Sequence, residues 1–391
     1  MPETFVLAPD SFKESMTAEQ ACQAMQRGIQ KVLADARFIQ VPMADGGEGT
    51  VDALTAAQGG QKIECEVTGP LASQKIHTYF GLVDEGKTAI IEMAKANGIH
   101  LLEAAQRNPL ITTTLGTGEM IKMALDLGVS KIIIGIGGSV TNDAGAGMAQ
   151  ALGAKFLDAA ECDVVVGGGQ LDQIKRIDLS ALDARLTQVD IVIASDVNNP
   201  LTGTHGASYV FAPQKGATTE MVKILDHNLC YFADLTEQQL GIYCRKIAGA
   251  GAAGGLGFGL MVFTGAKIQS GVELMIEQTH LAEKIAQADY VLTGEGKIDF
   301  QTKFGKTPFG VAQVAKRLHK PVIAFAGIVG EGVEELYKEG FTQIIGINPP
   351  DCDLEDALKN AERHLETTVM NIALEIMNNL DTATFDVQKT E

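Results

Sequence analysis

The sequence predicts an α/β fold of two domains, in which both ends of the chain build one parallel sheet and the middle forms an inserted domain with a mixed sheet. A chain of 391 residues is too long for one hydrophobic core of ordinary size. At both ends, short apolar runs alternate with helical patterns, which is typical of parallel strands covered by helices. In the middle, three apolar runs follow one another with only turns between them, which favours antiparallel strands.

The N-terminal segment predicts the order strand, helix, strand, helix. Residues 4–9 form a short apolar run that ends in proline, and residues 18–36 then carry apolar side chains at helical spacing. Thr17 stands where a helix cap is expected. A second apolar run at 37–44 and a helix at 51–57 complete the segment.

The last hundred residues show the same rhythm and are expected to share a sheet with the N-terminal strands. Apolar runs alternate there with amphipathic patterns, and a long helix is predicted from Asp353 onward. The predicted strands lie at 288–296, 321–327 and 341–348, and the predicted helices at 308–319 and 332–340.

The middle of the chain predicts the inserted domain. Its first three strands are separated only by turns, and the later ones alternate with helices. The predicted strands span residues 62–69, 75–83, 87–94, 131–138, 189–196 and 207–213, and a helix at 273–287 closes the insertion. We therefore expect residues 1–70 and 286–391 to form one domain and residues 71–285 to form the other.

Charge and composition limit the class of partner. The net charge of −18 repels a phosphodiester backbone, and no run of lysines or arginines offers a compensating stripe, so nucleic acid is not an expected partner. A small anionic ligand would need a few well-placed cations and glycine N–H groups. The sequence leaves open assembly into a homo-oligomer.

Cysteine usage and hydropathy predict a cytoplasmic protein that does not enter a membrane. The six cysteines lie far apart with no C-x-x-C pair, as expected for reduced thiols. The N-terminus meets polar and acidic residues before an apolar core of signal-peptide length. Residues 247–266 are uncharged and long enough to cross a bilayer, but seven of these 20 residues are glycine. We expect a buried glycine-rich loop that runs into a packed helix.

Five predicted strands end in loops of unusual composition. Ligands of open parallel sheets collect outside the carboxyl ends of the strands, where glycine-rich loops bring backbone N–H groups close to an anion. The alternative for any one loop is that its glycines only allow a tight turn. The loops read APDSFKES at 8–15, MADGGEGT at 43–50, GIGGSVTNDAGAG at 135–147, ASDVNNPLTG at 194–203 and TGEGKIDFQTKFGKTP at 293–308.

Acidic residues and lysines recur in these loops and in the loop around Lys215. Mg²⁺ prefers carboxylate and phosphate oxygens, and a base must receive the proton of an attacking hydroxyl, so this mixture favours phosphoryl transfer. The alternative for a single aspartate is a helix cap, which Asp143 fits best. The acidic candidates are Asp10, Asp45, Glu48, Asp143, Asp196, Glu295 and Asp299, and the lysines are Lys13, Lys215, Lys297, Lys303 and Lys306.

Three other ligand-binding motifs are incomplete. A Walker A loop needs a glycine five residues before Gly305, where Phe300 stands. The glycine-rich loop lacks the third glycine of a dinucleotide fingerprint because Val140 occupies its place, so a dehydrogenase is poorly supported. A calcium loop beginning at Asp196 fails because Pro200 stands where an oxygen ligand belongs.

Nine blocks together resemble the type I glycerate kinases, in that family's order. Four positions, Val140, Ala144, Ser195 and Ile247, depart from the pattern that we expect of the family, and none of the departures removes a charged residue. The blocks are APDSFKES, ADGGEGTVDAL, EMAKANGI, RNPLITTTLGTGEMI, GIGGSVTNDAGAGM, SDVNNPLTG, APQKGAT, GAGAAGGLGFGL and TGEGKIDFQTKFGKTP.

The resemblance implies transfer of the γ-phosphoryl group of ATP to D-glycerate with Mg²⁺, giving 2-phosphoglycerate. It also implies two α/β domains, one of them flavodoxin-like, with the active site in the cleft between them. The loop that ends in the GKT of residues 305–307 looks like a nucleotide-site loop of this family. The alternatives are 3-phosphoglycerate as the product, a non-catalytic sensor of a sugar acid or nucleotide, and a dehydrogenase acting on tartronate semialdehyde.

Loop position and charge type suggest roles for individual residues as hypotheses. Asp196 is the proposed base, and Lys13 and Lys297 balance phosphate or carboxylate charge. Asp45 and Asp299 are the candidates for holding Mg²⁺. The candidates for binding glycerate are Asp10, Ser11, Asp45, Gly46 and Gly47, and those for binding ATP are Gly137, Gly138, Ser139, Asn142, Gly294, Glu295, Gly296 and Thr302.

Overall fold

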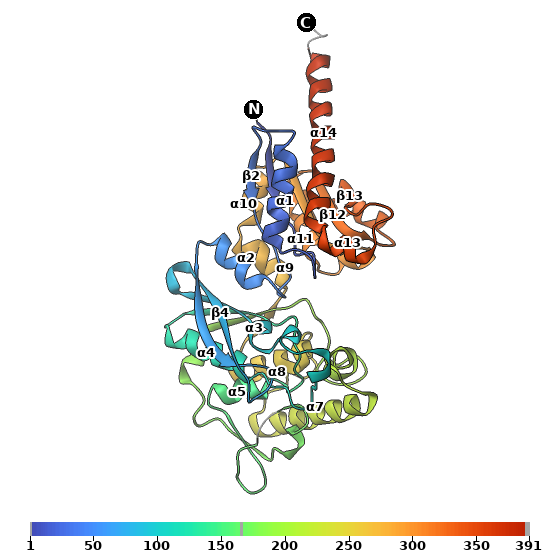
Figure 1. Cartoon of the computed structure of the whole chain (residues 1–391). Helices are drawn as coiled ribbons and strands as arrows, with labels where there is room; N and C mark the ends of the chain where they lie inside the picture. The colour runs from blue at the N-terminus through green and yellow to red at the C-terminus, as the bar shows by residue number, and fades with distance from the viewer. Residues whose placement is uncertain (1, 165–166, 388–391) are drawn as a thin grey trace. The chain divides into compact units, whose positions relative to one another are not determined.

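The computed structural model describes residues 2–164 and 167–387 and divides the chain into two compact units (Figure 1). The first unit contains the residues up to Asp45 together with those from Val272 onward, and the second contains Gly46–Gly271. Both ends of the chain therefore fold together and the middle is inserted, as the sequence predicts.

The first unit is built on a parallel sheet of five strands in the order β2, β1, β11, β12, β13. Counted along this unit, the order is 2-1-3-4-5, which is that of flavodoxin-like sheets. The strands are β1 (Thr4–Leu7), β2 (Arg37–Gln40), β11 (Tyr290–Ile298), β12 (Val322–Val329) and β13 (Gln343–Gly346). The fold class predicted from the sequence is confirmed.

Helices α1 (Ala18–Gln30) and α14 (Ala361–Val387) pack side by side in the first unit (Figure 1). Thr17 caps α1, because its Oγ1 accepts a 3.2 Å hydrogen bond from Gln20 N while Gln20 Oε1 accepts one of 2.8 Å from Thr17 N. A Cβ at Gly28 would lie 2.6 Å from Glu366 O, so glycine allows the two helices to approach closely. The other helices of this unit are α9 (Gly271–Gln278), α10 (Leu281–Ala286), α11 (Thr307–Arg317), α12 (Glu334–Tyr337) and α13 (Leu354–Lys359).

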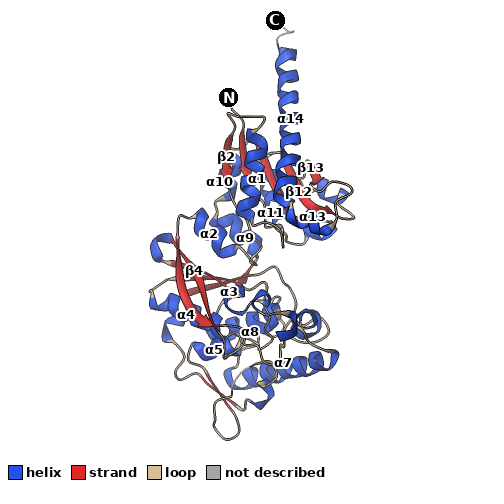
Figure 2. Cartoon of the chain, in the orientation of Figure 1, coloured by secondary structure: helices blue, strands red, loops and turns tan. Residues whose placement is uncertain are grey.

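The second unit contains a six-stranded mixed sheet in the order β10, β9, β6, β5, β4, β3, whose strands are red in Figure 2. β3 and β4, and likewise β4 and β5, are antiparallel, whereas β5, β6, β9 and β10 run parallel. The strands are β3 (Gln61–Thr68), β4 (Lys75–Val83), β5 (Thr88–Glu92), β6 (Lys131–Gly135), β9 (Asp190–Ala194) and β10 (Lys267–Gln269). β7 (Lys155–Leu157) and β8 (Arg176–Asp178) form a separate pair.

The second unit has two large apolar cores and a small third cluster around Ala212, Val222 and Leu225. In one, α4 and α8 pack on the mixed sheet, and in the other, α7 packs with α8 and β7 around Phe156, Phe232, Phe258 and Phe263. The helices are α2 (Thr50–Ala57), α3 (Ala94–Asn97), α4 (Leu115–Asp126), α5 (Ala146–Ala151), α6 (Ala207–Phe211), α7 (Thr219–Leu240) and α8 (Ala252–Thr264). Nearly all of α8 is buried, which confirms the packed helix expected within residues 247–266.

None of the helices in residues 2–164 and 167–387 combines the length and the apolar composition that crossing a bilayer requires.

The compact units begin and end at other residues than the expected domains. β3 pairs with β4 along its whole length and therefore belongs to the second unit, which begins at Gly46 rather than near residue 70. At the other boundary α9 already belongs to the first unit, where Val272 lies against Gly310 of α11. The predicted helix at 273–287 is broken at His280, whose φ of 52° is left-handed.

Residues 207–211 form α6 and Pro213 begins a short 3-10 turn, so the strand predicted at 207–213 is wrong. Tyr209 and Val210, whose side chains favour strands, are 41% and 43% exposed, whereas Ala207 is buried. Both edges of β9 are already paired, with β6 and with β10, so the sheet offers no position beside β9 for this segment. Tertiary context thus overrides β-propensity.

Candidate active site

The carboxyl edge of the first unit's sheet gathers three acidic residues. β1 and β11 are neighbours, and the loop after β1 stays close to β11 because Asp10 N donates a 2.8 Å hydrogen bond to Gly294 O. Asp45, which follows β2, raises the pKa of both Asp10 and Glu295 by Coulombic repulsion. Strand order reverses between β1 and β11, which is where flavodoxin-like sheets bind ligands.

The pKa of Asp10 is raised further from its ordinary value than that of Glu295. Burial is the main cause that raises its pKa to about 7, and repulsion from Asp45 and Glu295 adds to it. Two hydrogen bonds act in the opposite direction: Ser11 N donates to Oδ1 at 2.6 Å and Thr307 Oγ1 donates to Oδ2 at 2.5 Å. Each oxygen keeps a further lone pair for a ligand.

Glu295 is held by a lysine and a threonine. Burial raises its pKa to about 6, although Lys306 Nζ lies 3.1 Å from Oε2 and Thr302 Oγ1 donates to Oε1 at 3.2 Å. Lys306 also donates to Lys297 O at 3.0 Å. The lysine of the GKT sequence therefore contacts a carboxylate of the protein itself.

The carboxylate of Asp299 makes its contacts within its own loop. Its Oδ1 accepts a 2.9 Å hydrogen bond from Gln301 N, and its Oδ2 pairs with Lys297 Nζ at 2.9 Å. Thr302 Oγ1 accepts a 3.2 Å bond from Asp299 N. The pair with Lys297 is the main cause that lowers the pKa of Asp299. The structure thus brings Asp45 to Asp10 and Glu295, and gives Asp299 the role of a helix cap.

Gly294, Glu295 and Gly296 lie in a strand, as the strand predicted at 288–296 requires, although the sequence also assigns them to the loop expected at 293–308. β11 continues to Ile298, with Gly294 opposite Phe325 and Glu295 opposite Ala326 of β12. A Cβ at Gly294 would lie 2.5 Å from Phe325 O, so glycine is needed for close strand packing. The composition predicts a loop because glycine and glutamate are both depleted in strands.

The carboxyl edge of the second unit's sheet is lined by loop glycines. β5, β6 and β9 end at Glu92, Gly135 and Ala194 along one edge. A Cβ at Gly46 would lie 2.7 Å from Ala194 O, and one at Gly137 would lie 2.8 Å from Gly47 Cα. The predicted substrate glycines and the predicted nucleotide loop are therefore neighbours within this unit.

The loop after β6 is supported from beneath by Lys215. Gly137 and Gly138 are exposed, whereas Ser139 is buried and its Oγ accepts a 2.7 Å hydrogen bond from Lys215 Nζ. Lys215 Nζ also donates to Thr141 O at 2.7 Å. Burial of the lysine lowers its pKa to about 7, against the attraction of Asp143.

Asp143 and Asn142 lie inside the protein and hold the same loop. The carboxylate of Asp143 is fully buried and accepts hydrogen bonds from Thr114 N at 2.8 Å and Thr114 Oγ1 at 2.9 Å, and from two glycine amides. Asn142 Nδ2 donates to Ser208 Oγ of α6 at 3.1 Å. The N-cap of α5 is Gly145 and carries no side-chain cap, so Asp143 holds the loop rather than capping the helix, and Asn142 lies too deep for its side chain to reach the surface.

Asp196 follows β9 and is half-buried at the edge that also carries Gly137 and Gly138. Glu92, at the end of β5, accepts a 2.7 Å hydrogen bond from Val51 N, and burial is the main cause that raises its pKa to about 7. Coulombic attraction to Lys95 opposes this rise. The two carboxyl groups therefore lie at the carboxyl ends of β5 and β9, the two strands that flank β6.

Sequence reasoning gave no role to Thr307, Glu92, Lys306 or Lys215. Thr307 is the last residue of the GKT that fails as a Walker A motif, and Glu92 stands in the block EMAKANGI. Lys306 and Lys215 were noted only as loop lysines. All four residues stand in the blocks that resemble the family, and this was the only sequence feature that could have pointed to them. Their hydrogen-bond partners could not be read from the sequence because they come from distant segments, as for Asp10 and Thr307, which 297 residues separate.

Comparisons with known proteins find similar sequences and a similar structure over nearly the whole chain. The model of the glycerate kinase family matches residues 5–377. A glycerate kinase of Haemophilus influenzae is 51% identical over 369 residues, covering 94% of this chain and 97% of that protein. The glycerate 2-kinase of Escherichia coli K12 is 46% identical and covers 94% and 96%. The crystal structure of a Salmonella typhimurium LT2 protein assigned as glycerate kinase 2 has a TM-score of 0.86 at 46% identity, covering 97% of this chain and 100% of that one.

The α/β fold, the acidic edge and these relatives define a kinase that transfers phosphate to an alcohol group. The chain belongs to the glycerate kinase family, whose model spans nearly its full length. The resemblance drawn from the nine sequence blocks is thereby confirmed.

Proposed function

We propose that this kinase transfers the γ-phosphoryl group of ATP to D-glycerate and forms 2-phosphoglycerate. The observation that carries the proposal is sequence identity of about half, over nearly the whole chain, to relatives named glycerate kinase. One of these relatives is named glycerate 2-kinase. The acidic edge supports it, since phosphoryl transfer needs carboxylates for a metal ion and for a base.

Asp10, Asp45 and Glu295 are the proposed Mg²⁺ ligands. Burial and mutual repulsion raise the pKa values of Asp10 and Glu295, and a divalent cation would relieve that repulsion. Such a group of oxygen donors fits Mg²⁺, whose chemistry here is to neutralise charge on the ATP phosphates. Asp299 was paired with Asp45 in the sequence hypothesis, but its contacts with Lys297 and Gln301 favour a structural role.

The loop amides are the proposed anion contacts. Gly137 and Gly138 are exposed above the Ser139 and Lys215 pair, and glycine lets a phosphate approach their N–H groups. Ser11, Gly46 and Gly47 are proposed for glycerate. Lys13 and Lys297 are exposed cations, and they are proposed to balance charge as it develops on the transferred group.

Asp196 remains the proposed base. It stands at the carboxyl end of β9, beside the loop of Gly137 and Gly138, where an acceptor for a hydroxyl proton is needed. The proton of the glycerate hydroxyl passes to its carboxylate while the oxygen attacks the γ-phosphorus and ADP leaves.

The test is ³¹P NMR of the purified protein with MgATP and D-glycerate, with a control that lacks glycerate. Glycerate-dependent ADP and a new phosphomonoester signal are expected, and comparison with authentic 2- and 3-phosphoglycerate assigns the phosphorylated hydroxyl. A match to 3-phosphoglycerate contradicts the proposed product alone. ATP that stays intact across a range of sugar acids contradicts the kinase and favours a sensor.

A further inference from the structure

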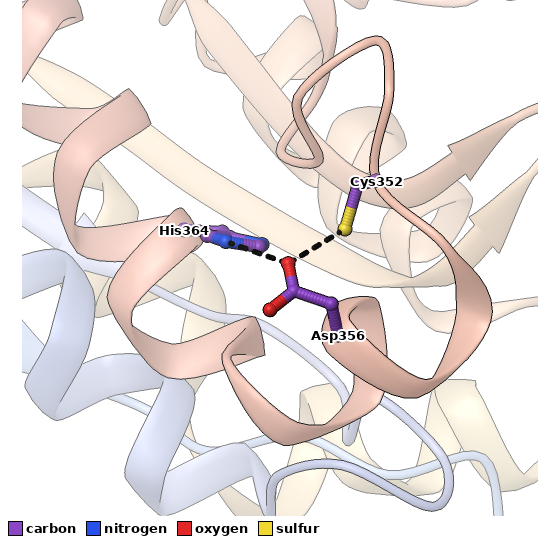
Figure 3. A group of neighbouring side chains, drawn as sticks. All are labelled: Cys352, Asp356 and His364. Atoms are coloured by element: carbon purple, nitrogen blue, oxygen red, sulfur yellow. Dashed lines mark hydrogen bonds and ion pairs between the residues drawn. The ribbon is translucent and has the colours of Figure 1, made fainter.

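Three side chains of different metal-binding types meet near the start of α14, apart from the residues assigned above (Figure 3). Cys352 precedes α13, Asp356 lies within α13 and His364 lies in the first turns of α14. Cys352 Sγ is 3.1 Å from Asp356 Oδ2, and His364 Nε2 is 3.8 Å from the same oxygen. One ligand atom from each residue lies within 4.8 Å of the other two.

The orientation of His364 is fixed by an amide behind it. Asn348 Nδ2 donates a 2.8 Å hydrogen bond to Gly327 O, which turns Asn348 Oδ1 toward His364 Nδ1 at 3.1 Å. An amide oxygen only accepts, so Nδ1 carries the proton and the lone pair of the neutral ring is on Nε2. That lone pair faces Asp356 Oδ2, which is also an acceptor, and an oxygen acceptor behind a histidine ligand is the usual arrangement at metal sites.

The remaining contacts leave one carboxylate oxygen available for an ion. Asn360 Nδ2 donates to Asp356 Oδ1 at 2.6 Å, so Oδ1 is engaged and Oδ2 faces the sulfur and the imidazole. The Asp356 side chain is 47% exposed, whereas that of His364 is 8% exposed. An ion can therefore enter from solvent on the carboxylate side and keep a water molecule.

We propose that Cys352 Sγ, Asp356 Oδ2 and His364 Nε2 bind a divalent cation of the Zn²⁺ class, with water as the fourth ligand. Sulfur and imidazole ligands select Zn²⁺ over Mg²⁺, which prefers oxygen. Binding replaces the hydrogen bond from the Cys352 thiol to Asp356, and the thiol proton passes to solvent. The ion joins the segment before α13 to α13 and α14.

Cobalt titration of the full-length chain without a histidine tag tests the site. After removal of metal with a chelator, Co²⁺ is added and the near-ultraviolet thiolate-to-Co²⁺ charge-transfer band is recorded. We expect one band that saturates at one equivalent, disappears on addition of Zn²⁺ and persists in excess Mg²⁺. A wild-type protein that develops no such band contradicts the proposal and leaves the three residues as a hydrogen-bonded cluster.

Four variants test which residues give rise to the charge-transfer band. Cys352→Ser abolishes it, whereas Cys162→Ser, at an exposed free cysteine of the second unit, leaves it unchanged. Asn348→Ala weakens Co²⁺ binding about 10- to 100-fold, because it removes the acceptor that orients His364. If Cys352→Ser does not fold, Asp356→Asn serves instead and should shift the visible Co²⁺ bands. Persistence of the charge-transfer band in a folded Cys352→Ser variant overturns the assignment.

Discussion

Lys215 Nζ donates a 2.7 Å hydrogen bond to Ser139 Oγ, although 76 residues separate the two. Lys215 is 1% exposed and also donates to Thr141 O at 2.7 Å, so a buried amine fixes both ends of a short loop segment. The amides of Gly137 and Gly138, which we propose to bind phosphate, directly precede Ser139. Their position therefore depends on a lysine that stands beneath the loop.

Replacing Lys215 by Met should impair catalysis through this loop. We expect kcat/KM for ATP to fall about 10- to 100-fold, the range that a misplacement of about 1 Å can cause. Steady-state kinetics with varied ATP measures it, with Lys223→Met on the exposed surface of α7 as the matched control. Unchanged kinetics in the Lys215 variant would show that the loop does not need its support.

The same substitution has a signature in stability against pH. Burial lowers the pKa of Lys215 from 10.5 to about 7, so between those values the unfolded chain binds a proton that the folded chain does not. This group therefore makes the wild type more stable as the pH rises from 7 toward 10.5. The stability of wild type relative to Lys215→Met should increase over that window, which urea titrations at both ends can measure.

Ionisation of Glu92 should make the stability of the folded protein depend on pH in the opposite direction. Burial raises its pKa from 4.5 to about 7, so within that window the folded chain holds a proton that the unfolded chain has released, and stability falls as the pH rises. Glu92→Gln removes this loss and can still accept the hydrogen bond from Val51 N. We expect the variant to gain about 1–3 kcal/mol over wild type between pH ~5 and pH ~8. A difference between the two proteins that does not change with pH contradicts this account.

Gly46 is required by both backbone angle and space. Its φ is +85°, and an added Cβ would lie 2.7 Å from Ala194 O. Gly46→Ala should cost about 2–4 kcal/mol of unfolding free energy, from left-handed strain and steric overlap together. Gly49→Ala is the matched control, since its φ is +91° but nothing lies within 4 Å of an added Cβ. It should cost only about 1 kcal/mol in the same thermal or urea unfolding assay, and equal losses would contradict the steric argument.

The fold was largely predictable because its signals are local. Alternating strands and helices at both ends, and the Thr17 cap, require only neighbouring residues to be read. The predicted strand at 207–213 failed because the pairing of β9 with β6 and β10 is decided by distant segments.

The site was predictable as a set of loops, but the partners within it were not. Asp10 and Asp299 look alike in the sequence, since each is an aspartate in a polar loop. Only the structure shows that Asp10 meets Asp45, whereas Asp299 meets Lys297. An aspartate can either cap a helix or belong to a group of mutually repelling carboxylates. Which of the two occurs depends on which strands are neighbours in the sheet, and the sequence does not give this.

Asp196→Asn tests the proposed base. The substitution keeps the size of the side chain but removes its ability to accept a proton, so kcat should fall by about 100-fold or more while the fold is retained. Turnover by coupled assay and far-ultraviolet circular dichroism measure the two quantities. Near-normal turnover in a folded variant would remove Asp196 from the role of base.

Asp10 and Asp299 should respond in opposite ways to the same substitution. At pH ~8, Asp10→Asn relieves the burial and repulsion that raise its pKa, and Thr307 Oγ1 can accept from the new amide, so the folded protein should be more stable.

The Asp10→Asn variant should also lose most of its turnover and need a higher Mg²⁺ concentration for half-maximal activity, because one proposed ligand is gone. Asp299→Asn instead loses the ion pair with Lys297, and should destabilise by about 1 kcal/mol while most turnover remains. Urea unfolding and Mg²⁺ titrations of activity on both variants distinguish the two aspartates. If Asp299→Asn raises the Mg²⁺ concentration needed for half-maximal activity and Asp10→Asn does not, the metal belongs at Asp299 and the assignment made from the acidic group around Asp10 is wrong.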